Sequence, residues 1–217
     1  MKKIIVLFVT VLIASQIVQA QGTVYVSSLN PTSTGSPSVA SDYWLAALFE
    51  TGNNAGGYML DSIQLGMADA LGNPSGFTVM LYAKSSFVGA ILPGSSLGTL
   101  NGSANPSTAG IYAYTPASNL TLSPSTFYFI VLTAGTTIVN GSYEWSESAY
   151  PPSASGDWSV DNAVLHSSNG TSGWSTTPYF GIAQFAITAT PIPEPSPSWL
   201  LLLGSGIFIY ARRALRR

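Results

Sequence analysis

The apolar residues of this chain recur in short runs separated by Gly, Pro, Ser and Asn, and this pattern predicts β-strands. Runs rich in β-branched and aromatic side chains favour pleated strands. The strand candidates are 58–65, 77–82, 111–114, 126–133 and 179–188. Residues 127–132 are apolar without interruption, as expected of a central strand that is covered on both faces. Residues 42–50 fit either a strand or a short amphipathic helix.

Turn signals lie between these runs. Gly56-Gly57 and the Asn-Gly pairs at 101, 140 and 169 tolerate positive φ, and Asn-Gly between strands is a strong hairpin signal. Three of these asparagines, together with Asn119, also begin Asn-x-Ser/Thr sequons, but tight turns explain the Asn-Gly pairs more simply. Short strands at this spacing, without a longer repeat, predict an all-β fold. We expect an antiparallel two-sheet sandwich, jelly-roll-like, flanked by an N-terminal signal peptide and a C-terminal hydrophobic helix.

The N-terminal residues have the organisation of a secretory signal peptide. Lys2 and Lys3 precede the apolar stretch 4–14, and Val18-Gln19-Ala20 offers small or apolar residues before a cleavage site. Cleavage is expected after Ala20. The chain therefore divides into a signal peptide at 1–20, a β-sandwich ectodomain at 21–190 and a tail at 191–217.

The tail combines three features in a fixed order. A proline-rich linker contains Pro193, Glu194 and Pro195; an uncharged apolar run follows from Trp199 to Tyr210; the chain then carries Arg212, Arg213, Arg216 and Arg217. Prolines keep the linker extended, and the apolar run can sit in hydrocarbon as a short transmembrane helix. The run is short for a bilayer, and arginines that reach the headgroups nearly close the gap. Arginines after such a run hold that end in the cytoplasm.

This order resembles the PEP-CTERM sorting signal of Gram-negative bacteria that make exopolysaccharide. The resemblance implies that an exosortase, a membrane protease-transpeptidase, recognises the tail and processes it near the Pro-Glu-Pro motif. It also implies export, contact with the secretion machinery and a transient inner-membrane anchor. The final location would be the cell surface or the extracellular matrix.

A second resemblance covers most of residues 41–188. The segments 44–52, 58–63, 77–82 and 120–128 and the later tryptophans are similar to the choice-of-anchor surface domains. The resemblance implies a β-sandwich paired with an interchangeable C-terminal anchor. It carries over no catalytic residue.

The distribution of charge excludes one class of partner. Residues 21–190 contain one lysine and eight carboxylates, which gives a charge near −7 (one minus eight), while the whole chain is at −2. Nucleic-acid binding is excluded, because it depends on cationic contacts with phosphates. The chain has no cysteine, and therefore no disulfide, thiolate metal site or cysteine nucleophile. We expect no cofactor.

The acidic residues give little sign of an enzyme. Glu144 and Glu147 lie three apart, and on a strand they would point to opposite faces. Asp157 and Asp161 have even spacing and could share a strand face, which leaves a Ca²⁺ site open, but no EF-hand loop is present. His166 lies in a Ser/Asn/Gly-rich stretch and is expected in a solvated loop. We assign no catalytic residue and no metal ligand.

Three tryptophans of the last third offer a binding alternative. Trp145, Trp158 and Trp174 are interleaved with glycine, serine and acids, and exposed rings of this kind stack on sugars. Burial in the core is the favoured interpretation, because large rings contribute most there. The sequence therefore predicts a non-enzymatic surface or exopolysaccharide-matrix protein with a structural or adhesive role. A carbohydrate-binding module is the alternative, and a secreted hydrolase is a more distant third.

Overall fold

The computed structural model describes residues 22–30, 32–86, 89–176 and 181–194 of the 217-residue chain. Two of the predicted segments, the signal peptide ending at Ala20 and the apolar run of the tail, lie outside the described residues. So do Pro195 and the four arginines Arg212, Arg213, Arg216 and Arg217.

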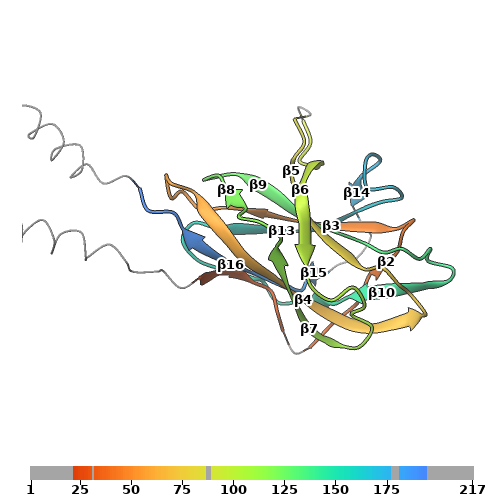
Figure 1. The fold of residues 1–217 in the computed structure, drawn as a ribbon. Helices are drawn as coiled ribbons and strands as arrows, with labels where there is room; N and C mark the ends of the chain where they lie inside the picture. The colour runs from red at the N-terminus through yellow and green to blue at the C-terminus, as the bar shows by residue number, and fades with distance from the viewer. Residues whose placement is uncertain (1–21, 31, 87–88, 177–180, 195–217) are drawn as a thin grey trace, which may run out of the picture.

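The described residues form strands and no helix (Figure 1). The longer strands are β1 (Thr23–Ser27), β3 (Trp44–Glu50), β4 (Tyr58–Gly72), β5 (Thr78–Lys84), β6 (Pro93–Asn101), β7 (Gly110–Pro116), β9 (Phe127–Thr133), β10 (Gly141–Trp145), β13 (Ser159–Ser167) and β16 (Phe185–Pro191). The two-residue strands are β2 (Ser38–Val39), β8 (Thr121–Leu122), β11 (Glu147–Ser148), β12 (Ser153–Ala154), β14 (Ser175–Thr176) and β15 (Ile182–Ala183). The predicted all-β class is confirmed, and 42–50 is resolved as strand β3.

Antiparallel pairing links most of these strands into one sheet that curls on itself. Its order is β12-β1-β16-β4-β7-β6-β5-β9-β3-β13-β14. In addition, β10 and β8 pair with β4, β2 pairs with β10, and β11 and β15 form a separate two-stranded sheet. The curl occurs between β6 and β7, which pair only at Leu100–Pro116 and Asn101–Thr115. The two halves of the sheet therefore face each other as the layers of a sandwich.

One hydrophobic core fills the space between the halves. It includes Ile63 of β4 and Ile187 of β16 from one half, and Val79 of β5 and Ile130 of β9 from the other. A second cluster covers the outer face of β3, β5 and β9, where Ala46, Met80, Tyr82, Phe129 and Val131 alternate with the core residues. Strand β9 lies between β5 and β3 and is buried on both faces, which explains its uninterrupted apolar sequence.

The turn predictions hold in part. Gly57 has φ 74° and Gly170 has φ 70°, as turn glycines should. The Asn169 side chain accepts hydrogen bonds from the backbone amides of Thr171 and Ser172, which is an asparagine-stabilised turn. The prediction of a tight hairpin at Asn101-Gly102 is wrong, because β6 ends at Asn101 and β7 begins only at Gly110. These two strands belong to opposite halves and need a longer connection.

The two ends of the domain lie side by side. Thr23 at the start of β1 pairs with Ala189 near the end of β16, and Pro191 pairs with Tyr58 at the start of β4.

Candidate binding site

The structure does not place the three tryptophans on one exposed face. Trp145 is fully buried and Trp158 is 4% exposed, and both belong to the main core. Trp174 packs on the outer-face cluster, and its buried indole nitrogen has no hydrogen-bond partner among the described residues. The core interpretation is confirmed for Trp145 and Trp158, which cannot stack on a sugar from these positions.

Trp158 is the centre of an aromatic group near the end of the domain where the chain leaves. Its ring stacks on Tyr25 at 4.8 Å and lies parallel to Phe49 at 5.9 Å, while Tyr58 meets it edge-on at 5.0 Å. Offset and edge-on contacts of this kind add to the stability gained from burial alone. The ring therefore packs this end of the core.

Both glutamates of β10 and β11 are buried, which the sequence did not predict. Glu144 Oε1 accepts hydrogen bonds from the Ser38 hydroxyl at 2.8 Å and the Ser142 hydroxyl at 2.7 Å. Burial raises the pKa of Glu144, and the serine hydroxyls partly oppose that shift. Glu147 is 3% exposed, its Oε1 has no hydrogen-bond partner among the described residues, and burial raises its pKa.

The surroundings of Glu147 explain how a carboxyl fits there. A Cβ on Gly35 would lie 3.0 Å from Glu147 Oε2, and one on Gly181 would lie 2.8 Å from the same atom. Two glycines therefore leave the space that the carboxyl occupies. Glu144 and Glu147 thus have different neighbours.

Asp157 and Asp161 do not share a strand face, and this prediction is wrong. Asp157 lies in the turn before β13, with φ 62°, because the strand begins only at Ser159. Asp161 lies where the register of β13 shifts between Val160 and Val164, and its Oδ1 accepts the Ala163 amide at 3.2 Å. Within the described residues, no group of three or more His, Asp or Glu side chains could hold a metal ion.

His166 lies in β13 rather than in a solvated loop. Its ring stacks on Tyr43 at 5.1 Å, and Nε2 is 3.2 Å from the Ser175 hydroxyl of β14. The Ser/Asn/Gly-rich residues that suggested a loop belong to the turn that follows, between β13 and β14. His166 is in a strand because it pairs with Leu45 of β3. The local composition around His166 does not indicate this pairing.

The most distinctive feature of the sheet is a junction where β4 changes partner. β16 pairs residues 58–65 of β4, and β10 pairs residues 67–72. At the change, the Gly66 amide donates to Gln184 O at 2.9 Å, Ser146 N donates to Gly66 O at 2.9 Å, and Gln184 N donates to Ser146 O at 2.7 Å. Three chain segments therefore close a ring of backbone hydrogen bonds, called here the three-strand junction.

Gly66 is required by this junction. A Cβ at this position would lie 2.7 Å from Oε1 and 2.9 Å from Cβ of Gln184, so the Gln184 side chain occupies the space over the glycine. The indole nitrogen of Trp145 donates to Gln184 O at 3.0 Å from the core side. Gln184 is therefore held from both sides.

A hollow of about 400 Å³ opens at the junction, and we call it the junction pocket. It lies within the range of about 300–1,000 Å³ that is usual for small-molecule sites. Its lining is uncharged and comes from the loop after β1, from β4, from the start of β7 and from the junction itself. The lining residues are Leu29, Asn30, Ser33, Gly66, Met67, Ala68, Ala109, Gly110, Ile111, Ser146 and Gln184.

No spacing rule could have found this pocket from the sequence. Its polar groups come from positions as distant as 30, 146 and 184, and none of them is a charged or metal-binding type. Gly66, directly after the predicted strand 58–65, was the one local signal, since a glycine in an extended segment often marks a bulge or a close backbone approach. That signal does not say which residue approaches.

A second hollow of about 350 Å³ lies on the outer face beside the shifted register of β13. Glu50, Phe127 and Asp161 line it, and the Ser159 hydroxyl donates to Glu50 Oε2 at 3.3 Å. The ammonium of Lys84 lies 5.4 Å from the centre of the Phe127 ring. Its two carboxyls are at most partly buried, so water can solvate them without a ligand.

The start of the tail is attached to the domain rather than separated from it. β16 runs through Pro191, and the Ile192 amide then donates to Gly57 O at 3.0 Å. The Asn54 side-chain amide donates to Ile192 O at 3.0 Å, and Glu194 Oε1 accepts the Ala55 amide at 3.3 Å. The expected linker therefore does not leave the domain at residue 191, because residues 192–194 form hydrogen bonds with the turn at 54–57.

Replacing Asn54 with alanine is expected to release this exit segment. The change removes side-chain hydrogen bonds to Ile192 O and to Gly57 O. At about 1 kcal/mol of net stability, their loss should speed hydrogen exchange of the Ile192 amide roughly five- to tenfold. Asn73→Ala is the matched control, because that side chain is exposed and makes no hydrogen bond in the described part of the chain. Equal exchange in the two variants would show that Asn54 does not hold the segment.

The described part of the chain is thus an antiparallel all-β domain that carries an uncharged pocket at a strand junction. No family model matches the chain, and no curated protein or solved structure is significantly similar to it. Among the described residues, none form a helix that is long and apolar enough to cross a membrane. Only the chain's own residues therefore bear on what it does.

Proposed function

We propose that the protein is an exported, non-enzymatic component of the cell surface or of the exopolysaccharide matrix, with a structural or adhesive role. The observation that carries this proposal is the order of features at the C-terminus. Pro193-Glu194-Pro195, an apolar run and an arginine cluster follow one another there. The proposed partners are an exosortase and the secretion machinery, with the inner membrane as a transient anchor and exopolysaccharide as the surroundings.

The character of the domain supports this proposal. Lys84 is the one lysine or arginine in the described residues, and Ser, Thr, Gly and Asn make up much of the sequence. A surface that hydrogen-bonds but carries few cations is suited to hydrated polysaccharide. The separated environments of Glu144 and Glu147 supply no acid–base pair, so no observation favours the hydrolase alternative.

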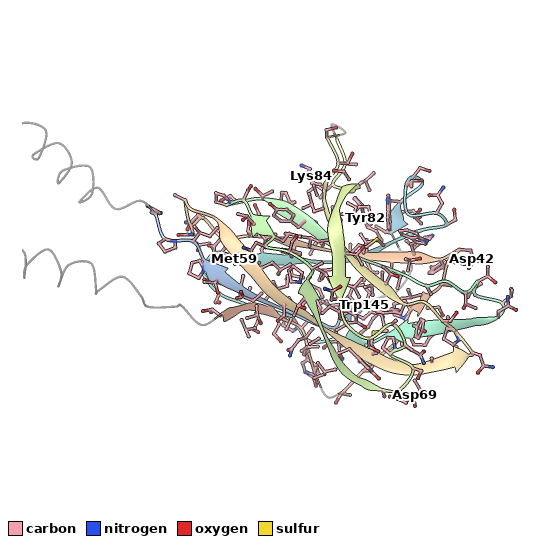
Figure 2. The ribbon with its side chains drawn as sticks, viewed as in Figure 1. Asp42, Met59, Asp69, Tyr82, Lys84 and Trp145 are labelled. Atoms are coloured by element: carbon pink, nitrogen blue, oxygen red, sulfur yellow. The ribbon has the colours of Figure 1, made fainter. Side chains whose placement is uncertain are left out.

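The direction in which the chain leaves the domain also supports the proposal. Pro191 pairs with Tyr58, while the junction pocket lies at Gly66 on the same strand. At about 3.3 Å per residue, these two points of β4 are roughly 26 Å apart. Figure 2 shows Met59 near the end where β16 leaves and Asp69 well away from it. An anchor attached through the tail would thus leave the pocket directed away from the anchored end.

The test is the intact mass of the protein recovered from its native host, with and without the exosortase. A species ending near residues 193–195, found only when the exosortase is present, is the expected result. A variant with Arg212, Arg213, Arg216 and Arg217 replaced by glutamine should accumulate unprocessed. A full-length C-terminus in both strains would contradict the proposal.

A further inference from the structure

We infer that the junction pocket is a binding site for a neutral sugar ring. This inference adds a ligand class to the proposed matrix role, and it rests on that role only for the source of the sugar. It differs from the tryptophan-based alternative, because no tryptophan lines the pocket.

Two nearly buried side chains present unused hydrogen-bonding atoms to the pocket. Ser146 is 5% exposed, and its hydroxyl makes no hydrogen bond within the described residues. Gln184 is 4% exposed, and its Nε2 donates to Glu147 O at 3.3 Å and approaches Thr32 O at 3.5 Å. Its Oε1 then remains an acceptor without a partner in the described part of the chain. Neither atom is among the fully buried unpaired atoms of the described residues, so both open onto the pocket, where water or a ligand can bond to them.

The rim adds a donor of the complementary type. Asn30 Oδ1 accepts the Thr32 amide at 3.0 Å, which leaves the Asn30 amide nitrogen unbonded among the described residues. The pocket therefore offers a hydroxyl, an acceptor and a donor at different points of its wall. Sugar hydroxyls both donate and accept, so one polyhydroxylated ring can satisfy all three.

The remaining walls are aliphatic. Leu29, Met67 and Ile111 line the pocket beside the polar groups, and Ile111 is 63% exposed. Aliphatic side chains can pack against the C–H faces of a pyranose. A charged ligand is disfavoured, because no residue of the lining carries a charge. Burying even a neutral polar group without a hydrogen-bond partner costs about 2–7 kcal/mol, and burying an unpaired ion costs more.

A peptide strand is disfavoured by the state of the backbone. Peptides usually bind to a sheet by pairing with a free strand edge. Here Gly66, Ser146 and Gln184 hydrogen-bond to one another, and Gly66 and Met67 are also paired with Ile111 and Gly110 of β7. The unbonded polar groups of the pocket are side-chain atoms. They are suited to hydrogen bonds with the hydroxyls of a ligand rather than to pairing with a peptide backbone.

The pocket is held in shape by contacts outside it. The Trp145 indole fixes the backbone of Gln184, and Asp69 Oδ1 accepts the Ala109 amide at 2.8 Å and so fixes the rim at Ala109 and Gly110. A pocket that is already formed loses little conformational entropy on binding. Glycan affinity should then depend mainly on the side chains that face the ring.

The test is titration of the full-length protein in mild detergent with neutral oligosaccharides of glucose, galactose and mannose, and with an acidic oligosaccharide for comparison. Binding of at least one neutral oligosaccharide is expected. Ser146→Ala, which breaks no described hydrogen bond, should weaken it about three- to tenfold, the value of one hydrogen bond. Ile111→Ala should weaken it to a similar extent through the lost apolar contact. The matched controls Ser95→Ala and Ile138→Ala should leave binding unchanged.

Absence of binding by every neutral oligosaccharide would overturn the inference, as would binding that both pocket variants leave intact. Preference for the acidic oligosaccharide or for extended peptides would also overturn it. The processing of the tail, measured by intact mass, is independent of these results. A processed protein that binds no sugar contradicts this inference alone, and an unprocessed protein that binds sugar contradicts the sorting proposal alone.

Discussion

Replacing Trp145 with alanine is expected to lower the free energy of unfolding by about 4 kcal/mol, within the range of about 3–5 for a large buried aromatic residue. The side chain is fully buried in the main core, and Figure 2 shows it at the centre of the molecule. The change leaves a cavity beside Phe185 and removes one of the two hydrogen bonds that Gln184 O accepts, leaving the one from the Gly66 amide. The measurement is a denaturant titration followed by far-ultraviolet circular dichroism, which does not depend on the lost fluorophore.

Trp174→Ala is the matched control. Trp174 is only partly buried, and its indole nitrogen makes no hydrogen bond within the described part of the chain, so its loss should cost about 1–2 kcal/mol through reduced apolar burial. Trp145→Phe should fall between the two, because it keeps most of the volume and loses the hydrogen bond. Equal losses for Trp145→Ala and Trp174→Ala would show that the three-strand junction does not depend on Trp145.

Replacing Glu147 with glutamine is expected to stabilise the protein at neutral pH, by about 1–2 kcal/mol for an unmet buried group. Burial raises the pKa of Glu147 in the folded protein above its value in the unfolded chain. The folded state therefore binds the proton more tightly than the unfolded chain does. The free energy of unfolding is highest below the pKa that Glu147 has in the unfolded chain, where the carboxyl is neutral in both states, and it falls as pH rises through the pKa in the folded protein. Glutamine stays neutral, and its advantage should vanish near pH 4.

The measurement is the unfolding free energy of both proteins from pH 4 to pH 8. Glu144 also has a raised pKa and contributes to the pH dependence of both proteins with the same sign, so the difference between them isolates Glu147. Glu50→Gln is the control: that side chain is half-buried and accepts from Ser159, and its replacement should change stability by only a few tenths of a kcal/mol. A Glu147→Gln protein that is no more stable at pH 8 than at pH 4, relative to the native sequence, would contradict this account.

The strands that sequence reasoning found are those whose own residues require burial. Strand β9 is apolar throughout, and β5 carries Val79, Met80, Leu81 and Tyr82, so hydrophobicity alone places them in a sheet. Strand β6 reads Pro-Gly-Ser-Ser-Leu-Gly-Thr-Leu-Asn and carries no such signal. It is a strand because β5 offers it a pairing edge, which depends on residues elsewhere in the chain.

The same distinction applies to the candidate sites. The tryptophans and His166 are residue types that are common in binding or catalytic sites. In the structure they pack in the core or pair in the sheet. The junction pocket is made by Ser146, Gln184 and Asn30, which are common and uncharged, and their meeting depends on β4 exchanging one partner for another at Gly66. The spacing of these residues in the sequence does not predict that they come together, because the register of three strands determines their positions. The sorting motif is a local signal, and it remains a prediction from the sequence.

The position of β16 has a mechanical consequence. Its end is continuous with the tail, and the strand lies between β1 and β4, antiparallel to both. A pull on the tail acts along the strand, so it loads the hydrogen bonds on both sides of residues 185–189 together instead of opening them one after another. Rupture would require these bonds to fail cooperatively, which makes forced unfolding slow. A domain tethered through this strand would resist shear from flowing liquid.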